Sequence, residues 1–130
     1  MNSSERFRRL AGAATLLAIP FSLGSSGLLM AAAGGDNQLL LSGLLVGIGV
    51  RGAAFFRWGM LLDVLGYYLL LAPLALYLRE RFKGQGGSFV TLYTLCGLAY
   101  ILIGAMGAII LAAVGPDLMR EYALAQEPQR

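Results

Sequence analysis

The chain has 130 residues, of which 58% are hydrophobic and only 13% charged, and its formal net charge is +3. Soluble domains carry about 25% charged residues. This composition, with a mean hydropathy of +0.71, therefore excludes an ordinary water-soluble domain and indicates a surface that faces lipid. The chain has no histidine and one cysteine, which excludes histidine-based catalysis, an intrachain disulfide and a cysteine-rich metal centre. We expect no metal site and no cofactor.

Three stretches are long and apolar enough to cross a bilayer as helices, which takes about 20 residues. Residues 10–33 and residues 89–114 contain no charged side chain, and residues 58–78 contain only Asp63. A proline lies inside the first stretch and another inside the second. Each predicts a kink rather than a break, because neighbouring groups in a bundle can bond the carbonyl that a proline leaves free.

The direction of the chain follows from two short basic clusters, one before the first stretch and one after the second. Positive residues beside membrane spans are typically cytoplasmic, so both clusters should share that side, with an even number of crossings between them. Residues 39–56, which contain Arg51 and end beside Arg57, are then predicted to form an interfacial or short membrane helix on the outer side. The clusters are Arg6, Arg8 and Arg9 in one, and Arg79, Arg81 and Lys83 in the other.

The sequence thus predicts an all-α fold, a polytopic transmembrane helix bundle with three spans and one outer interfacial helix. Residues 1–130 form a single integral membrane domain, with the N-terminus cytoplasmic and the C-terminus outside. An alternative has four spans, which places Arg51 in lipid at a cost of a few kcal/mol on insertion scales. Another treats the N-terminus as a cleaved signal peptide, with residues 31–33 as a small-residue cleavage site.

Small residues recur along one face of the third stretch at spacings of seven, four, four and three. Helices in lipid associate mainly through close packing at such residues, so this face should meet another helix. The other helix belongs either to the same chain, to another membrane protein subunit or to a second copy. The predicted helix-packing face consists of Gly97, Gly104, Ala108, Ala112 and Gly115.

Asp63 is the one acid within the three predicted spans, and an intramembrane ionisable residue is a candidate functional site. Tyr67 lies four residues later on the same helical face and can donate its hydroxyl to the carboxylate. Arg57 is the basic residue nearest in sequence, but six positions place it about 120° from Asp63 around a helix, which is poor geometry for a direct pair. Arg51 or a partner chain is the alternative basic partner. The alternatives are a structural polar contact, a proton or ion site, and a contact with a lipid headgroup.

The remaining patterns favour binding over catalysis. No nucleophile elbow and no paired carboxylates are visible, so we predict that the protein is not an enzyme. The cations flank apolar stretches, which explains the positive charge without a nucleic-acid partner. Arg79, Arg81 and Lys83 are expected to orient the chain and to contact lipid headgroups.

The predicted function is a small structural or accessory subunit that packs against partner helices and membrane lipid. The alternative is an oligomeric transporter or channel element with Asp63 as its proton or ion site.

The stretch AFFRWGMLLD at residues 54–63, followed by LALYL at 74–78, resembles the front portion of a family of bacterial membrane proteins that carry domain of unknown function 4386. The resemblance extends more weakly to the Arg-rich N-terminus and to YILIG at residues 100–104. It implies a polytopic protein of the bacterial inner (plasma) membrane, with an outer segment leading into the second span. It implies no activity, because none is established for the family.

Overall fold

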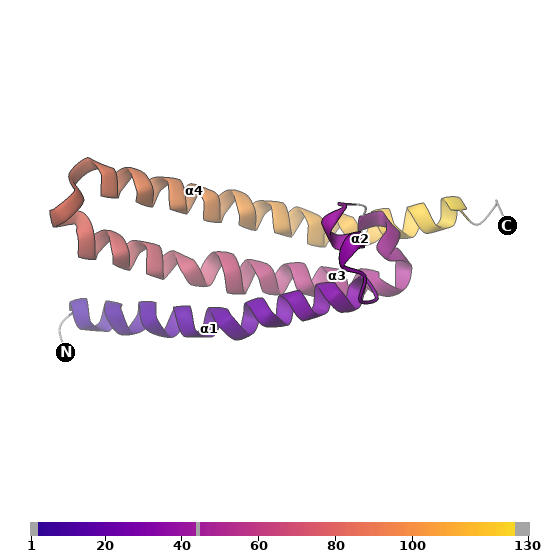
Figure 1. The fold of residues 1–130 in the computed structure, drawn as a ribbon, viewed down its shortest axis with the longest axis horizontal. Coiled ribbons are helices and arrows are strands. Elements are labelled where there is room, and N and C mark those ends of the chain that lie inside the picture. Colours follow the sequence, from indigo (N-terminus) through magenta and orange to yellow (C-terminus); the bar gives the residue numbers. More distant parts are fainter. Residues whose placement is uncertain (1–2, 44, 127–130) are drawn as a thin grey trace.

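The protein is helical throughout the part of the chain that its computed structural model describes, residues 3–43 and 45–126, and no strand occurs there. The predicted all-α fold is confirmed over these residues. Three α-helices and several short turns precede a fourth, very long helix that ends at Gln126 (Figure 1). The elements are α1 (Ser3–Ala32), α2 (Asn37–Leu41), a 3-10 turn (Leu45–Ile48), α3 (Gly49–Asp63), a π turn (Val64–Tyr68), a second 3-10 turn (Leu69–Leu71) and α4 (Ala72–Gln126).

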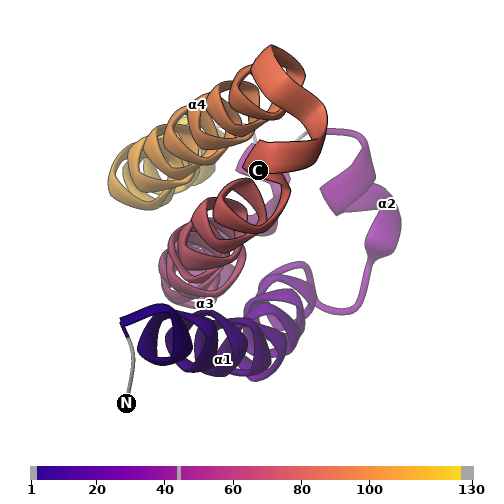
Figure 2. The same ribbon diagram turned by 90° about the vertical axis from the view of Figure 1, so that its left-hand side faces the viewer.

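The long helix α4 folds back on itself at Gly87, where the backbone leaves the helical region with φ 51° and ψ −132°. Glycine accepts this positive φ because it has no Cβ. We call residues 49–86 the middle arm and residues 88–126 the returning arm. The middle arm lies between α1 and the returning arm, and neighbouring arms run in opposite directions (Figures 1 and 2).

Two helical segments are long and apolar enough to cross a membrane, namely Glu5–Ala32 and Leu45–Gln126. The first contains most of the predicted stretch 10–33. The second contains both of the other predicted stretches, which lie on its two antiparallel arms. The composition and length of these helices are compatible with a membrane protein.

The connection between α1 and α3 differs from the predicted helix over residues 39–56. Helix α2 ends at Leu41 and α3 begins at Gly49. Asp36 caps α2, since its carboxylate accepts a hydrogen bond from the Gln38 backbone N–H at 2.8 Å. Gly43, with a φ of 72°, follows the end of α2 in the left-handed conformation that commonly terminates a helix. The second half of the predicted interfacial helix therefore belongs to the middle arm.

Pro73 changes the winding of the middle arm without breaking it. A proline has no N–H, so the carbonyl of Leu69, four residues earlier, loses its usual helical partner. The N–H of Ala72 donates to that carbonyl instead, which winds this part as a 3-10 turn. In the preceding π turn, the N–H of Leu69 donates to the carbonyls of Val64 and Leu65. The proline is thus accommodated by local rewinding.

Small side chains fill most of the contact between neighbouring arms. Gly66 lies so close to α1 that a Cβ on it would stand 2.6 Å from the Cβ of Phe21 and 2.9 Å from the backbone nitrogen of Ser22. The larger buried groups gather towards one end, where Phe56 and Met119 pack together. Most of the long apolar side chains, including Ile103 at 71% exposure, lie on the outside of the bundle. This is the reverse of the distribution in a water-soluble protein.

Candidate functional site

The beginning of α1 and the fold-back within α4 lie at the same end of the bundle, whereas α3 begins and α4 ends at the other end (Figure 1). We call the first end the basic end, because both basic clusters of the sequence lie in these segments. Phe7 of α1 packs there against Tyr77 of the middle arm, with ring centroids 6.3 Å apart. The basic side chains themselves are all exposed, namely Arg6, Arg8, Arg9, Arg79, Arg81 and Lys83.

Glu80 is the acid in the second basic cluster. Lys83 donates to its Oε2 at 2.6 Å, and Arg79 lies 3.3 Å from its Oε1. The hydrogen bond from Lys83, followed by the charges of Lys83 and Arg79, lowers the pKa of the Glu80 carboxyl below its ordinary value. Arg9 pairs with Glu5 in the first cluster, at 3.1 Å. The end as a whole keeps an excess of positive charge.

Asp63 lies half-buried on the middle arm, immediately before the π turn. Tyr67 and Tyr68 follow it within the next turn and a half of the same arm. The rings of Tyr67 and Tyr68 meet edge to face with centroids 5.1 Å apart, and Tyr68 lies 6.3 Å from Tyr100. We call these four residues the tyrosine cluster. The structure therefore brings Tyr100 of the returning arm alongside Tyr68, a contact that helical spacing could not identify.

None of the basic side chains in the described part of the chain forms an ion pair with Asp63. Arg51 is exposed in the first turn of α3, and Arg57 is committed elsewhere. The Nε of Arg57 donates to the backbone oxygen of Ala112 on the returning arm at 3.1 Å. That carbonyl would ordinarily bond the N–H of residue 116, which is a proline and has none. Arg57 thus satisfies the acceptor that Pro116 leaves free.

This hydrogen bond also accounts for the length of the returning arm. The third predicted span ends at residue 114, but the helix continues through the buried Pro116 to Gln126. The sequence contained a signal for this arrangement, because a proline inside a helix always frees the carbonyl four residues before it. The sequence did not indicate that an arginine of another arm lies beside that carbonyl.

Most of the predicted helix-packing face lies against the middle arm. Gly104 faces the ring of Tyr68, and a Cβ on Gly115 would stand 2.9 Å from Cε1 of Phe56. Ala108 and Ala112 are buried between these two contacts. At Gly97 a Cβ would meet nothing within 4 Å, so the contact between the two arms opens there.

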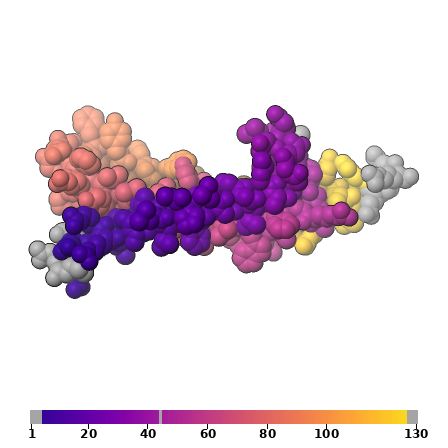
Figure 3. All heavy atoms as spheres, turned by 60° about the horizontal axis from the view of Figure 1, so that its bottom comes forward, coloured from indigo at the N-terminus to yellow at the C-terminus, as the bar shows by residue number. Residues whose placement is uncertain are grey.

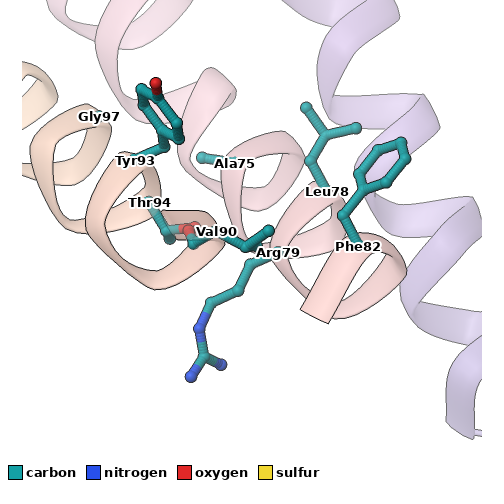
Figure 4. A pocket seen from close by; sticks show the side chains of 8 residues that line it. All are labelled: Ala75, Leu78, Arg79, Phe82, Val90, Tyr93, Thr94 and Gly97. Carbon is teal, nitrogen blue, oxygen red and sulfur yellow. The ribbon is translucent and has the colours of Figure 1, made fainter. Parts of the chain in front are cut away.

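Gly97 borders a groove of about 320 Å³ between the two arms of α4, near the basic end. Figure 4 shows the side chains of both arms around it, with the guanidinium of Arg79 extending away from the ribbon. Nearly all of the lining is apolar. It consists of Ala75, Leu78, Arg79 and Phe82 from the middle arm and Val90, Tyr93, Thr94 and Gly97 from the returning arm.

The described residues offer no obvious centre for metal chemistry. Within residues 3–43 and 45–126, no three His, Cys, Asp or Glu side chains come together in a way that could hold a metal ion. Cys96 is a free thiol on the outside of the returning arm. The polar groups that remain for a function are the tyrosine cluster and the charged ends of the bundle.

Comparison of the chain with protein-family models, with curated proteins and with solved structures finds no match. The resemblance to proteins with domain of unknown function 4386 therefore stays a prediction.

Proposed function

We propose that the chain is an integral membrane protein with three crossings, which acts as a structural or accessory subunit and carries out no reaction itself. The observation that carries this proposal is the order of the three arms. The middle arm is covered on both sides, so α1 and the returning arm each keep an outer face (Figure 2), and Figure 3 shows that of α1. These faces bear large exposed apolar side chains such as Leu16, Leu23 and Ile103.

The crossing number and the orientation rest on the positions of the charges. The basic end carries both basic clusters, and positive residues beside a membrane favour the cytoplasmic side. The connection at the opposite end contains only short helical turns, the longest being α2 with five residues. Such turns cannot cross about 30 Å of hydrocarbon, which disfavours a fourth crossing. We accordingly propose a cytoplasmic N-terminus and an outer C-terminus, in the bacterial inner membrane that the family resemblance implies.

The outer faces also carry glycines suited to a partner helix. A Cβ on Gly12, Gly27 or Gly107 would meet nothing within 4 Å. A helix of another subunit, or of a second copy, could approach the backbone closely at these positions. The proposed partners are therefore other membrane helices and the surrounding lipid.

The test is to extract the protein from its native membrane into nanodiscs and to identify what accompanies it. We expect a stable complex with another membrane subunit or a second copy, and we expect Gly107→Leu to dissociate it by blocking close approach. Ile103→Ala, on the same arm, is the control that changes an exposed apolar side chain without adding bulk. A chain that is monomeric and alone in native nanodiscs would contradict the accessory role.

The tyrosine cluster favours a second candidate, an oligomeric transporter or channel element in which Asp63 is the proton or ion site. Asp63 is half-buried, has no ion pair among the described side chains and is followed on its arm by Tyr67 and Tyr68, which pack against each other. Proton flux into liposomes containing the protein tests this role. Flux that Asp63→Asn abolishes and Asp117→Asn leaves intact would support it. Equal flux in wild type and Asp63→Asn would remove Asp63 from the role.

A further inference from the structure

The groove between the arms of α4 is formed by two helix faces that lie opposite each other without filling the space between them. Its lining residues follow the same spacing on both arms, which places each set on one helical face. On the returning arm that face is short of side-chain volume, because it includes Gly97 and Thr94. The groove is open to the outside of the bundle and its lining is apolar, so it suits an apolar occupant from outside the chain.

The chemistry of the lining specifies that occupant as a hydrocarbon chain. The hydroxyl of Thr94 donates to the backbone oxygen of Val90 at 2.7 Å, so it is satisfied within its own helix and offers no free polar contact. Ala75, Leu78 and Phe82 complete an apolar wall on the other side. The volume of about 320 Å³ is at the lower end of the range of ligand sites in proteins. It is suited to part of one acyl chain.

The positive charge around the groove favours a lipid whose headgroup is anionic. Arg79 belongs to the lining, and its side chain is 43% exposed. The carboxylate nearest to it, that of Glu80, is shared with Lys83, which lies closer at 2.6 Å. Arg81 belongs to the same basic cluster but does not line the groove. A phosphate can accept two parallel hydrogen bonds from a guanidinium, and the excess positive charge of this end attracts anionic lipid.

We propose that this groove is a binding site for one anionic phospholipid, with an acyl chain between the arms of α4 and the phosphate on Arg79. The site requires the membrane location proposed above, but it requires neither a partner subunit nor a role of Asp63. It places the bound lipid in the leaflet at the basic end of the bundle.

The experiment reconstitutes the purified protein into vesicles of equal parts phosphatidylglycerol and phosphatidylcholine, extracts it in mild detergent and measures the retained lipids by native mass spectrometry. We expect retained phosphatidylglycerol in excess over phosphatidylcholine. Arg79→Gln should lower its retention about tenfold, because a hydrogen bond to a charged group is lost. Gly97→Leu should lower it similarly by filling the groove.

Two matched variants make the result specific. Arg81→Gln removes the same charge from the same cluster outside the groove, and Gly107→Leu adds the same side chain to the same arm where there is also open space. Both should retain phosphatidylglycerol at the wild-type level.

Three results would overturn the site. They are equal losses of phosphatidylglycerol in Arg79→Gln and Arg81→Gln, equal retention of the two lipids by wild type, and full retention of phosphatidylglycerol in Gly97→Leu. Far-UV circular dichroism checks that each variant keeps its helices. If Gly97→Leu loses them, Thr94→Ile narrows the groove with a smaller change.

The outcomes separate this proposal from the proposed function. A monomeric protein that still retains phosphatidylglycerol through Arg79 would contradict the accessory role and support the lipid site. A complex with a partner subunit that retains no phosphatidylglycerol would support the accessory role and overturn the lipid site. Failure of the protein to enter vesicles at all would contradict the membrane location, and with it both proposals.

Discussion

Polar side chains in this chain bond backbone carbonyls both within their own helix, as at Thr15 and Thr94, and on a neighbouring arm. Arg57 is the clearest case, because its Nε bonds the Ala112 carbonyl that Pro116 leaves without a partner. An unsatisfied backbone carbonyl costs about 1–3 kcal/mol when it is buried. A helix containing an internal proline can therefore remain continuous when another arm supplies the missing donor.

This account predicts that the effects of Arg57 and Pro116 on stability depend on each other. Arg57→Ala should lower the free energy of unfolding by about 1–2 kcal/mol, as measured by reversible denaturant unfolding in micelles. In a Pro116→Ala background the loss should be much smaller, because the alanine supplies its own N–H to the carbonyl. An equal loss in both backgrounds would show that Arg57 stabilises the protein in some other way.

The ion pair at Glu80 predicts a dependence on pH. Lys83 lowers the pKa of this carboxyl below its ordinary value of 4.5, so the pair stabilises the folded hairpin above that pH. The stabilisation should be lost as the pH falls through the lowered pKa. Thermal unfolding across acidic pH should show a steeper decline for wild type than for Glu80→Gln. Identical pH profiles would mean that the pair contributes nothing.

The sequence identified Asp63, Tyr67 and Arg57 as notable but could not pair them correctly. Spacing of four residues predicts which side chains share a face within one helix. It contains no information about which residues another arm brings alongside. Tyr100 packs beside Tyr68, and Arg57 bonds the Ala112 carbonyl, through contacts between arms. Such contacts depend on the register of one helix against the next.

At the scale of the helices, glycines lie both where two arms approach each other closely and where a helix ends. The long apolar stretches, the continuation of the middle arm through its proline and the glycine strip were readable from the sequence, because period and composition are local properties. The break at Gly43 and the continuation of the helix through Pro116 were not predicted. Each depends on whether the surrounding structure supplies hydrogen-bond partners for the backbone groups at that point.

The contact of Gly104 with Tyr68 predicts that substitutions at two glycines of one arm have different effects on stability. Gly104→Leu should destabilise the bundle by about 1–3 kcal/mol through overpacking, whereas Gly107→Leu should change the stability of the monomer little, because a Cβ there meets nothing within 4 Å. Unfolding of both variants in micelles measures the difference. Tyr68→Ala should recover part of the loss in Gly104→Leu. Equal effects at the two glycines would contradict the assigned packing.

At the scale of the whole molecule, the path of the chain brings both basic clusters to the same end of the bundle. The two basic clusters are separated by about half of the sequence, and the fold returns the second cluster to the end where the first begins. The sequence predicted this arrangement from the preference of cations for one side of a membrane. The proposed functions all depend on it, since it fixes which faces meet lipid and which leaflet the groove reaches.

Site-directed labelling in intact cells tests this arrangement most directly. In a Cys96→Ser background, single cysteines are placed by Arg8→Cys, Lys83→Cys, Gln38→Cys and Glu121→Cys, and each is exposed to a thiol reagent that does not cross membranes. We predict that Gln38→Cys and Glu121→Cys react in intact cells, and that Arg8→Cys and Lys83→Cys react only after the membrane is permeabilised. Reaction of Arg8→Cys and Lys83→Cys from opposite sides would contradict the three-crossing arrangement.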